Sequence, residues 1–306
     1  MTAGNINMKF SRPIIVASSC LEFEKVRYNG QVIPSKIIND LKPFAEFIKV
    51  CPEYEIGLGV PRDPIRIVKV DDEYRLIQHN TNRDVTQEMN DFCSKFRDNL
   101  KQVDGFIFKS KSPTMGVKNI KVYAGMKGSP VIERCGGFFA GKIVETFQGY
   151  PIEEEDRLRN KKIRDHFLTK LFLFAHYREA KKENNLDAFQ EKNDLLFKFY
   201  NLELSKRLNI ENSDYFDLMK QIFDKPPNTD QIYNFFNEIL YLIQNRDEFQ
   251  KILKKYKNNK LGFHTIKEIL RFDLIDKKML NQSFFHSYPE ELVMDMEDDR
   301  KRDYWK

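Results

Sequence analysis

The sequence predicts a two-domain protein in which an N-terminal, Rossmann-like α/β domain precedes an all-α domain. Over the first 145 residues, short apolar runs alternate with amphipathic stretches, which is typical of a parallel sheet with helices on both faces. From Pro151 onward, apolar residues recur at i, i+3, i+4 and i+7, the spacing of a helix with one buried stripe. A chain of 306 residues is long enough for two cores. We predict domains at residues 1–148 and 149–306.

The hydrophobic pattern assigns the elements of the first domain in order. Runs such as "PIIVASSC" and "GFIFKS" are apolar throughout, as in strands buried on both faces. Pro34-Ser35 is a helix start signal, and we expect a helix to follow it. The expected strands are 13–20, 65–70, 74–79 and 105–110, and the expected helices are 34–50 and 85–103.

The second domain is predicted to contain helices only. Breaks at "KPPNTD" and "NNKLG" separate long amphipathic segments. These segments span 163–183, 186–209, 213–224, 229–259 and 264–276.

The composition places the protein among globular chains, with 41% hydrophobic and 32% charged residues. We expect no membrane span, because no apolar run approaches the roughly 20 residues that cross a bilayer. The N-terminus does not resemble a cleaved signal. Four widely spaced cysteines are too few for a secreted disulfide framework. A cytoplasmic location is therefore expected.

The net charge of +5 lies entirely in the first half of the chain. Residues 151–306 contain 29 basic and 29 acidic residues, which leaves 22 basic and 17 acidic residues in the first 150. The first half is thus the expected home of an anionic partner. A charge this small does not establish nucleic-acid binding.

Two of the cysteines occupy positions suited to chemistry. Cys20 and Cys51 are each expected to end a strand and open a polar loop, at the edge where parallel sheets carry their sites. The loop 110–116 should reach the same edge. Two thiolates there suit a soft metal or an iron–sulfur cluster, whereas Cys93 lies among apolar residues and is expected in the core. Glu53 is either a proton donor beside Cys51 or a carboxylate at a helix N-terminus.

Several segments resemble the successive motifs of the thiouracil desulfidase family. The helical half, through "HTIKEILRFDLIDKKMLNQSFFHSYPEEL", resembles the YbgA-type domain fused to such desulfidases in enzymes that act on 4-thiouridine in tRNA. The motifs in the first half are "SSCLEFEKVRYNGQ" (18–31), "CPEYEIGLGVPRDP" (51–64), "DVTQEM" (84–89) and "DGFIFKSKSPTMGVKNIKVY" (104–123).

The resemblance implies an oxygen-sensitive [4Fe-4S] cluster held by three cysteines, with one iron left open for the sulfur of a thiocarbonyl. Water then replaces the sulfur, so thiouracil becomes uracil without net redox change. Cys20 and Cys51 match two ligand positions of the family. Glu53 and Ser112 match residues that line its pocket, and we expect them to handle protons and substrate.

The third ligand position departs from the family motif Ser-Pro-Ser-Cys-Gly, because this chain has Met115 there. A thioether is a weaker iron donor than a thiolate. Cys135, in the small-residue loop "ERCGGFFAG", is a candidate for a displaced third ligand. The alternative is a buried thiol beside a Gly-Gly turn, with the cluster lost or held by two cysteines and another donor.

Further polar residues match the motifs or flank them. They are predicted to contact substrate or RNA, with surface or structural salt bridges as the alternative. These residues are Ser19, Arg27, Tyr28, Arg62, Ser110 and Lys111, with Lys109, Lys118 and Lys121 as further candidates for contact with an RNA backbone.

The predicted function is therefore [4Fe-4S]-dependent removal of sulfur from a thiolated pyrimidine, with 4-thiouridine in tRNA as the favoured substrate. Free thiouracil and a thiolated nucleotide remain open. One alternative is a cluster-free RNA-binding accessory protein. Another is an enzyme that inserts sulfur into RNA, although the chain has no ATP-binding P-loop motif to activate the base. The sequence does not indicate an oligomeric state.

Overall fold

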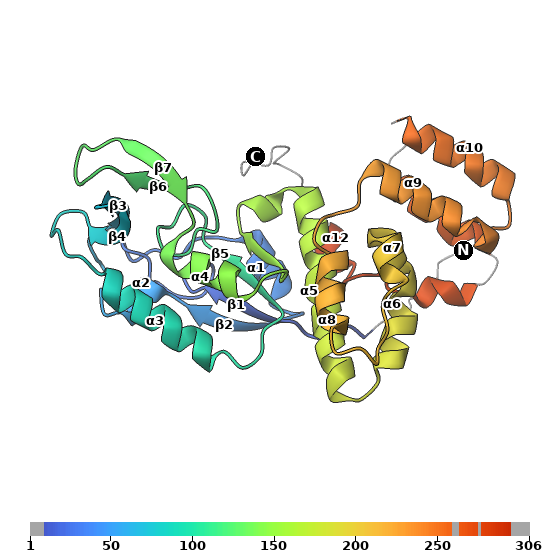
Figure 1. Cartoon of the computed structure of the whole chain (residues 1–306), viewed down its shortest axis with the longest axis horizontal. Helices are drawn as coiled ribbons and strands as arrows, with labels where there is room; N and C mark the ends of the chain where they lie inside the picture. Colours follow the sequence, from blue (N-terminus) through green and yellow to red (C-terminus); the bar gives the residue numbers. More distant parts are fainter. Residues whose placement is uncertain (1–8, 259–262, 275–276, 295–306) are drawn as a thin grey trace. The chain divides into compact units, whose positions relative to one another are not determined.

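The structure is a computed structural model that describes residues 9–258, 263–274 and 277–294. It contains two compact units (Figure 1). The first runs to Ala175 and takes in helix α12 (Glu291–Met294), and the second is His176–Glu290. The division falls within helix α5 (Lys161–Lys182) and not at residue 148. The reason is that the first half of α5 belongs to the first core, where Leu171 packs over Gly105.

A four-stranded parallel sheet organises the first unit, and this confirms the predicted α/β class. The strand order is β2-β1-β5-β8, so the chain places β2 on one side of β1 and β5 on the other. Loops that leave β1, β2 and β5 at their carboxyl ends meet at this reversal of strand order. The strands are β1 (Ile14–Ser18), β2 (Glu46–Val50), β5 (Gly105–Phe108) and β8 (Ile152–Glu154).

The helix predicted over 34–50 is wrong in its second half. Helix α1 (Lys36–Leu41) ends just before Pro43, whose ring and missing N–H do not allow a helix to continue. Residues 46–50 instead form β2, in parallel register with Ile14–Ser18. Tertiary pairing thus separates a segment that local periodicity joins.

A second sheet holds the strands predicted at 65–70 and 74–79, which do not join the parallel sheet. Asp71 and Asp72 both have positive φ, as a two-residue hairpin turn of type I′ requires, and they fold the two strands into an antiparallel pair. The strand order of this mixed sheet is β4 (Glu73–Gln78), β3 (Ile65–Val70), β6 (Ile120–Tyr123) and β7 (Val131–Cys135).

One hydrophobic core joins the two sheets to helices α3 (Thr86–Asn99) and α4 (Phe138–Thr146). Phe139 lies at its centre, with the rings of Phe92, Phe96 and Phe108 packed around it. Cys93 is buried in the same core, as predicted. Two short elements complete the unit, helix α2 (Pro52–Glu55) and the 3-10 turn η1 (Arg157–Arg159).

The second unit is entirely helical in the part that the structure describes, apart from an isolated bridge between Ile243 and Leu274. Two predicted segments, 186–209 and 229–259, are each divided. Asn201 ends one helix and caps the next by accepting a hydrogen bond from the Leu204 N–H. The elements are α6 (Leu186–Tyr200), α7 (Leu202–Ser205), α8 (Tyr215–Ile222), α9 (Thr229–Glu238), η2 (Leu240–Leu242), α10 (Arg246–Lys257), α11 (Phe263–Asp273) and η3 (Lys277–Asn281).

No helix of the described residues has the length and apolar character needed to cross a membrane.

Candidate active site

A cavity of about 250 Å³ lies at the carboxyl edge of the parallel sheet. The loops that follow β1, β2 and β5 form its walls. Ligand pockets for drug-sized molecules are larger, about 300–1,000 Å³. The size of this cavity suits a single heteroaromatic ring.

Most of the residues that the sequence predicts for the site line this cavity. Thr114 and Met115 also line it, and the sequence analysis did not assign Thr114 a role. The predicted residues found there are Ser19, Cys20, Arg27, Tyr28, Cys51, Glu53, Arg62, Ser110, Lys111 and Ser112.

Cys20 and Cys51 reach the cavity because they follow two paired parallel strands. Ser18 and Val50 are register partners, and the Ser19 N–H donates to the Val50 carbonyl at 2.9 Å. Burial raises the pKa of the Cys20 thiol to about 12, and the charge of Cys51 adds to this effect. Burial also raises the pKa of Cys51. Both thiols therefore keep their protons at neutral pH, and a metal ion is needed to displace them.

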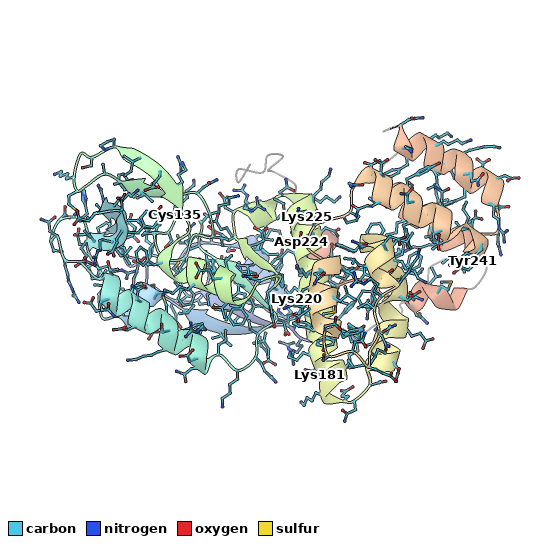
Figure 2. The ribbon with its side chains drawn as sticks, viewed as in Figure 1. Cys135, Lys181, Lys220, Asp224, Lys225 and Tyr241 are labelled. Carbon is cyan, nitrogen blue, oxygen red and sulfur yellow. The ribbon has the colours of Figure 1, made fainter. Side chains whose placement is uncertain are left out.

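Cys135 does not line the cavity. It ends β7 opposite Ile120 and is labelled in Figure 2. Its side chain is half-buried and packs against the hydrophobic core. Met115 occupies the cavity wall with Cys20 and Cys51. No three His, Cys, Asp or Glu side chains of the described residues form a group that would hold a metal ion. The donors at the cavity thus do not fit a cluster held by three cysteines, because they comprise two thiols and a thioether.

Arg62 uses every N–H donor of its guanidinium inside the protein. Its side chain is only 3% exposed. Nε and Nη2 donate to Glu53 Oε2 at 3.0 and 2.8 Å, and Nη2 also contacts Cys51 Sγ at 3.7 Å. Nη1 donates to the carbonyls of Val26 and Gly59 at 2.9 and 3.0 Å. These contacts account for the five donors that an arginine has. The predicted contact of Arg62 with substrate or RNA therefore gives way to a role in holding Glu53 and Cys51.

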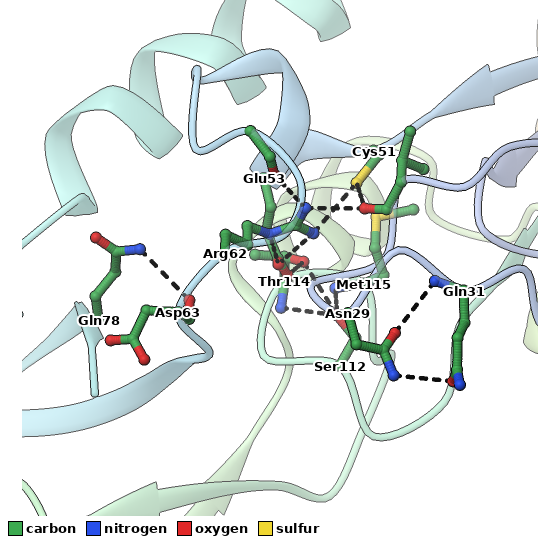
Figure 3. A network of polar contacts seen from close by, with 12 residues as sticks. Asn29, Gln31, Cys51, Glu53, Arg62, Asp63, Gln78, Ser112, Thr114 and Met115 are labelled. Carbon is green, nitrogen blue, oxygen red and sulfur yellow. Dashed lines mark hydrogen bonds and ion pairs between the residues drawn. The ribbon is translucent and has the colours of Figure 1, made fainter. Parts of the chain in front are cut away.

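The other oxygen of Glu53 belongs to a network of hydroxyl groups (Figure 3). Thr114 Oγ1 donates to Glu53 Oε1 at 3.0 Å and lies 3.1 Å from Ser112 Oγ. Ser112 Oγ also accepts the N–H groups of Thr114 and Met115, at 3.3 and 3.1 Å. Glu53 and Thr114 are 61 positions apart in the chain.

Helix α4 holds the loop that carries Ser112 and Thr114. The N–H groups of Phe139 and Ala140 both donate to the Thr114 carbonyl at 3.0 Å. Gly137 permits this approach, because a Cβ atom there would lie 2.6 Å from the same carbonyl oxygen. The Gly-Gly turn after Cys135 therefore has a packing role at the edge of the site.

A second ion pair borders the cavity beside Cys20. Lys109 Nζ pairs with Glu155 and donates to Ser110 Oγ at 2.9 Å. The Ser110 N–H donates to Glu155 Oε2 at 2.6 Å. Lys109 and Ser110 are thus committed to a structural network. Arg27 makes a contact of a different kind. Its guanidinium carbon lies over the Tyr28 ring, 5.1 Å from the ring centre, as in a cation–π interaction.

The family model described as 2-thiouracil desulfurase matches residues 15–155. A solved structure described as the [4Fe-4S]-dependent thiouracil desulfidase TudS is 24% identical, covers 48% of this chain and 93% of that chain, and has a TM-score of 0.38. No curated protein sequence matches the chain. The resemblance that the sequence motifs predicted is confirmed, and residues 15–155 are similar to the 2-thiouracil desulfurase family.

Proposed function

We propose that the first unit removes sulfur from a thiolated pyrimidine bound in the cavity and replaces it with the oxygen of water. One observation carries the proposal: a desulfurase-family domain brings two thiols, a carboxylate and two hydroxyls to a cavity the size of one base. The carbon–sulfur bond breaks and a carbon–oxygen bond forms. With water as co-reactant and hydrogen sulfide as product, no oxidant or reductant is needed.

Cys20 and Cys51 are the side chains that would hold an iron centre in this proposal. Iron–sulfur clusters are held by cysteine thiolates, and a thiolate is also the ligand that a soft metal ion prefers. The predicted [4Fe-4S] cluster needs a third thiolate, which the cavity does not supply. The proton chemistry assigned to Glu53 and Ser112 does not pass through such a cluster.

We also propose 4-thiouridine in tRNA as the substrate. Lys111, Lys118 and Lys121 are exposed and have no ion-pair partner among the residues that the structure describes. Lysines of this kind suit a phosphate backbone. A thiolated base must leave its stack to enter the cavity. The helical unit would then position the RNA, with the exposed Lys254 and Lys255 of α10 as candidate contacts.

Sulfide release is the direct test. The full chain, purified without oxygen and reconstituted with iron and sulfide, is incubated with 2-thiouracil, 4-thiouridine monophosphate or tRNA containing 4-thiouridine. We expect loss of thiocarbonyl absorbance with equimolar sulfide, fastest with the tRNA. Glu53→Gln should lower the rate about 100-fold or more, as loss of a general acid–base does. Absence of turnover with all three substrates would refute the proposal.

Met115 favours a second candidate function, that of a cluster-free accessory protein that binds RNA. Met115 places a neutral thioether where the motif has a cysteine, so the third anionic ligand that iron prefers is missing there. This candidate predicts tRNA binding that does not depend on iron, with no sulfide release. Binding measured with and without a chelator separates the two functions.

A further inference from the structure

We propose that Thr114 is a positioning residue that carries a proton between Ser112 and Glu53. The inference rests on the proposed function, since it concerns how the same site activates water. Its side chain lies between the two residues that the sequence analysis selected for proton chemistry. Thr114 is only 1% exposed, so bulk water does not compete for its hydroxyl.

The hydrogen bonds of Ser112 and Thr114 run in one direction. A threonine hydroxyl has one proton, and that of Thr114 is donated to Glu53 Oε1. In the contact of 3.1 Å between the two hydroxyls, Ser112 must therefore be the donor. Ser112 Oγ accepts two backbone N–H groups, which leaves its own proton for Thr114. The chain of donors thus ends at the carboxylate.

Arg62 keeps Glu53 ready to receive the proton at Oε1. Both Nε and Nη2 of Arg62 bind Oε2, so that oxygen is already satisfied. A proton that reaches Glu53 by way of the hydroxyls arrives at Oε1, the oxygen that Thr114 contacts.

The relay gives a balanced step for the attack of water. Water takes the place of the Thr114 N–H, the longer of the two backbone contacts of Ser112 Oγ at 3.3 Å, and gives its proton to that oxygen. Ser112 gives its proton to Thr114 Oγ1, and Thr114 gives its proton to Glu53 Oε1. Hydroxide adds to the thiocarbonyl carbon. Reversal of the relay returns the proton to the sulfur, which departs as hydrosulfide, and the proton of the added hydroxyl passes to water as the C=O bond forms. The sum is thiocarbonyl plus water to carbonyl plus hydrosulfide and a proton, which together are hydrogen sulfide. Glu53 ends as the carboxylate that it was.

Two substitutions at one position test the relay. Thr114→Val keeps the shape of the side chain and removes the hydroxyl, while Thr114→Ser keeps the hydroxyl. We expect Thr114→Val to lower kcat about 10- to 100-fold, below the full effect of an acid–base group. Thr114→Ser should restore most of that loss. Thr146→Val is the matched control, because Thr146 is exposed at the end of helix α4, away from the cavity lining, and its hydroxyl donates to the Lys142 carbonyl.

The solvent isotope effect separates proton transfer from packing. If the relay operates, kcat of Thr114→Val should have a larger deuterium effect than kcat of the wild type, with KM nearly unchanged. A raised KM with unchanged kcat, or equal losses in Thr114→Val and Thr114→Ser, would overturn the relay alone. A wild-type chain that releases no sulfide from any thiolated pyrimidine would overturn the proposed function, and the relay with it.

Discussion

The four cysteines divide into two pairs whose settings differ. Cys20 and Cys51 follow the carboxyl ends of two parallel strands and line a cavity. Cys93 is buried in the core between the second sheet and helices α3 and α4, and the half-buried Cys135 packs against that core. Burial raises the pKa of each thiol to about 11. Residue type is the same in both regions. What separates the pairs is the sheet: Cys20 and Cys51 follow strands of the parallel sheet, whereas Cys135 ends an antiparallel strand of the second sheet and Cys93 lies in helix α3.

The largest expected effect is the loss of activity when either cavity cysteine is replaced. Cys20→Ser and Cys51→Ser should each abolish sulfide release, because each removes one of the two thiols at the cavity. Cys135→Ser should retain activity, since its side chain packs against the core and does not line the cavity. Sulfide assays under anaerobic conditions measure all three. Loss of activity in Cys135→Ser, without loss of stability, would restore Cys135 as the third ligand.

The second test adds a third thiol to the cavity. Met115→Cys places a third thiol on the cavity wall that Cys20 and Cys51 share. After anaerobic reconstitution this variant should bind about four irons and four sulfides per chain, and the wild type should bind fewer. Iron and acid-labile sulfide analysis checks this result. Four irons in the wild type would contradict our interpretation of Met115.

A third test compares the two ion pairs that border the cavity. Arg62→Gln leaves the Glu53 carboxylate without its charge partner and should lower the free energy of unfolding by about 3 kcal/mol. Lys109→Gln should cost less, because the side chain of Lys109 is 20% exposed and that of Arg62 only 3%. Urea denaturation measures both. Equal losses of unfolding free energy in the two variants would show that exposure does not determine how much each ion pair contributes to stability.

The smallest expected effect concerns stability at high pH. The pKa of Cys20 rises from 9.0 to about 12 on folding, so the folded thiol keeps its proton where the unfolded one loses it. The contribution is complete below pH 9 and is lost as the pH rises toward 12. Cys20→Ser should flatten the decline of unfolding free energy above pH 9. Cys93→Ser should flatten it less, since its pKa rises only to about 11. If the unfolding free energy declined with pH at the same slope in both variants and the wild type, burial of the two thiols would be contradicted.

The fold class was predictable from the sequence because burial sets the spacing at which apolar residues recur along each strand and helix. The apolar residues of β1 and β5 form unbroken runs, as expected of central parallel strands, and the helical half keeps the spacing of 3.6 residues. The cavity position of Cys20 followed from the same pattern, whereas that of Cys51 depended on β2, a segment that the periodicity assigned to a helix. The family motifs added Glu53 and Ser112, which periodicity alone does not indicate.

Other features depended on contacts between distant segments. The sequence alone determined which stretches are apolar, where prolines and glycines interrupt them, and which motifs carry the chemistry. The tertiary structure decided that 46–50 pairs as a strand, that Cys135 packs against the core, and that Thr114 joins Glu53 to Ser112. The physical reason is that a hydrogen bond across 61 positions depends on the folded path of the backbone, whereas hydrophobic periodicity is a property of neighbouring residues.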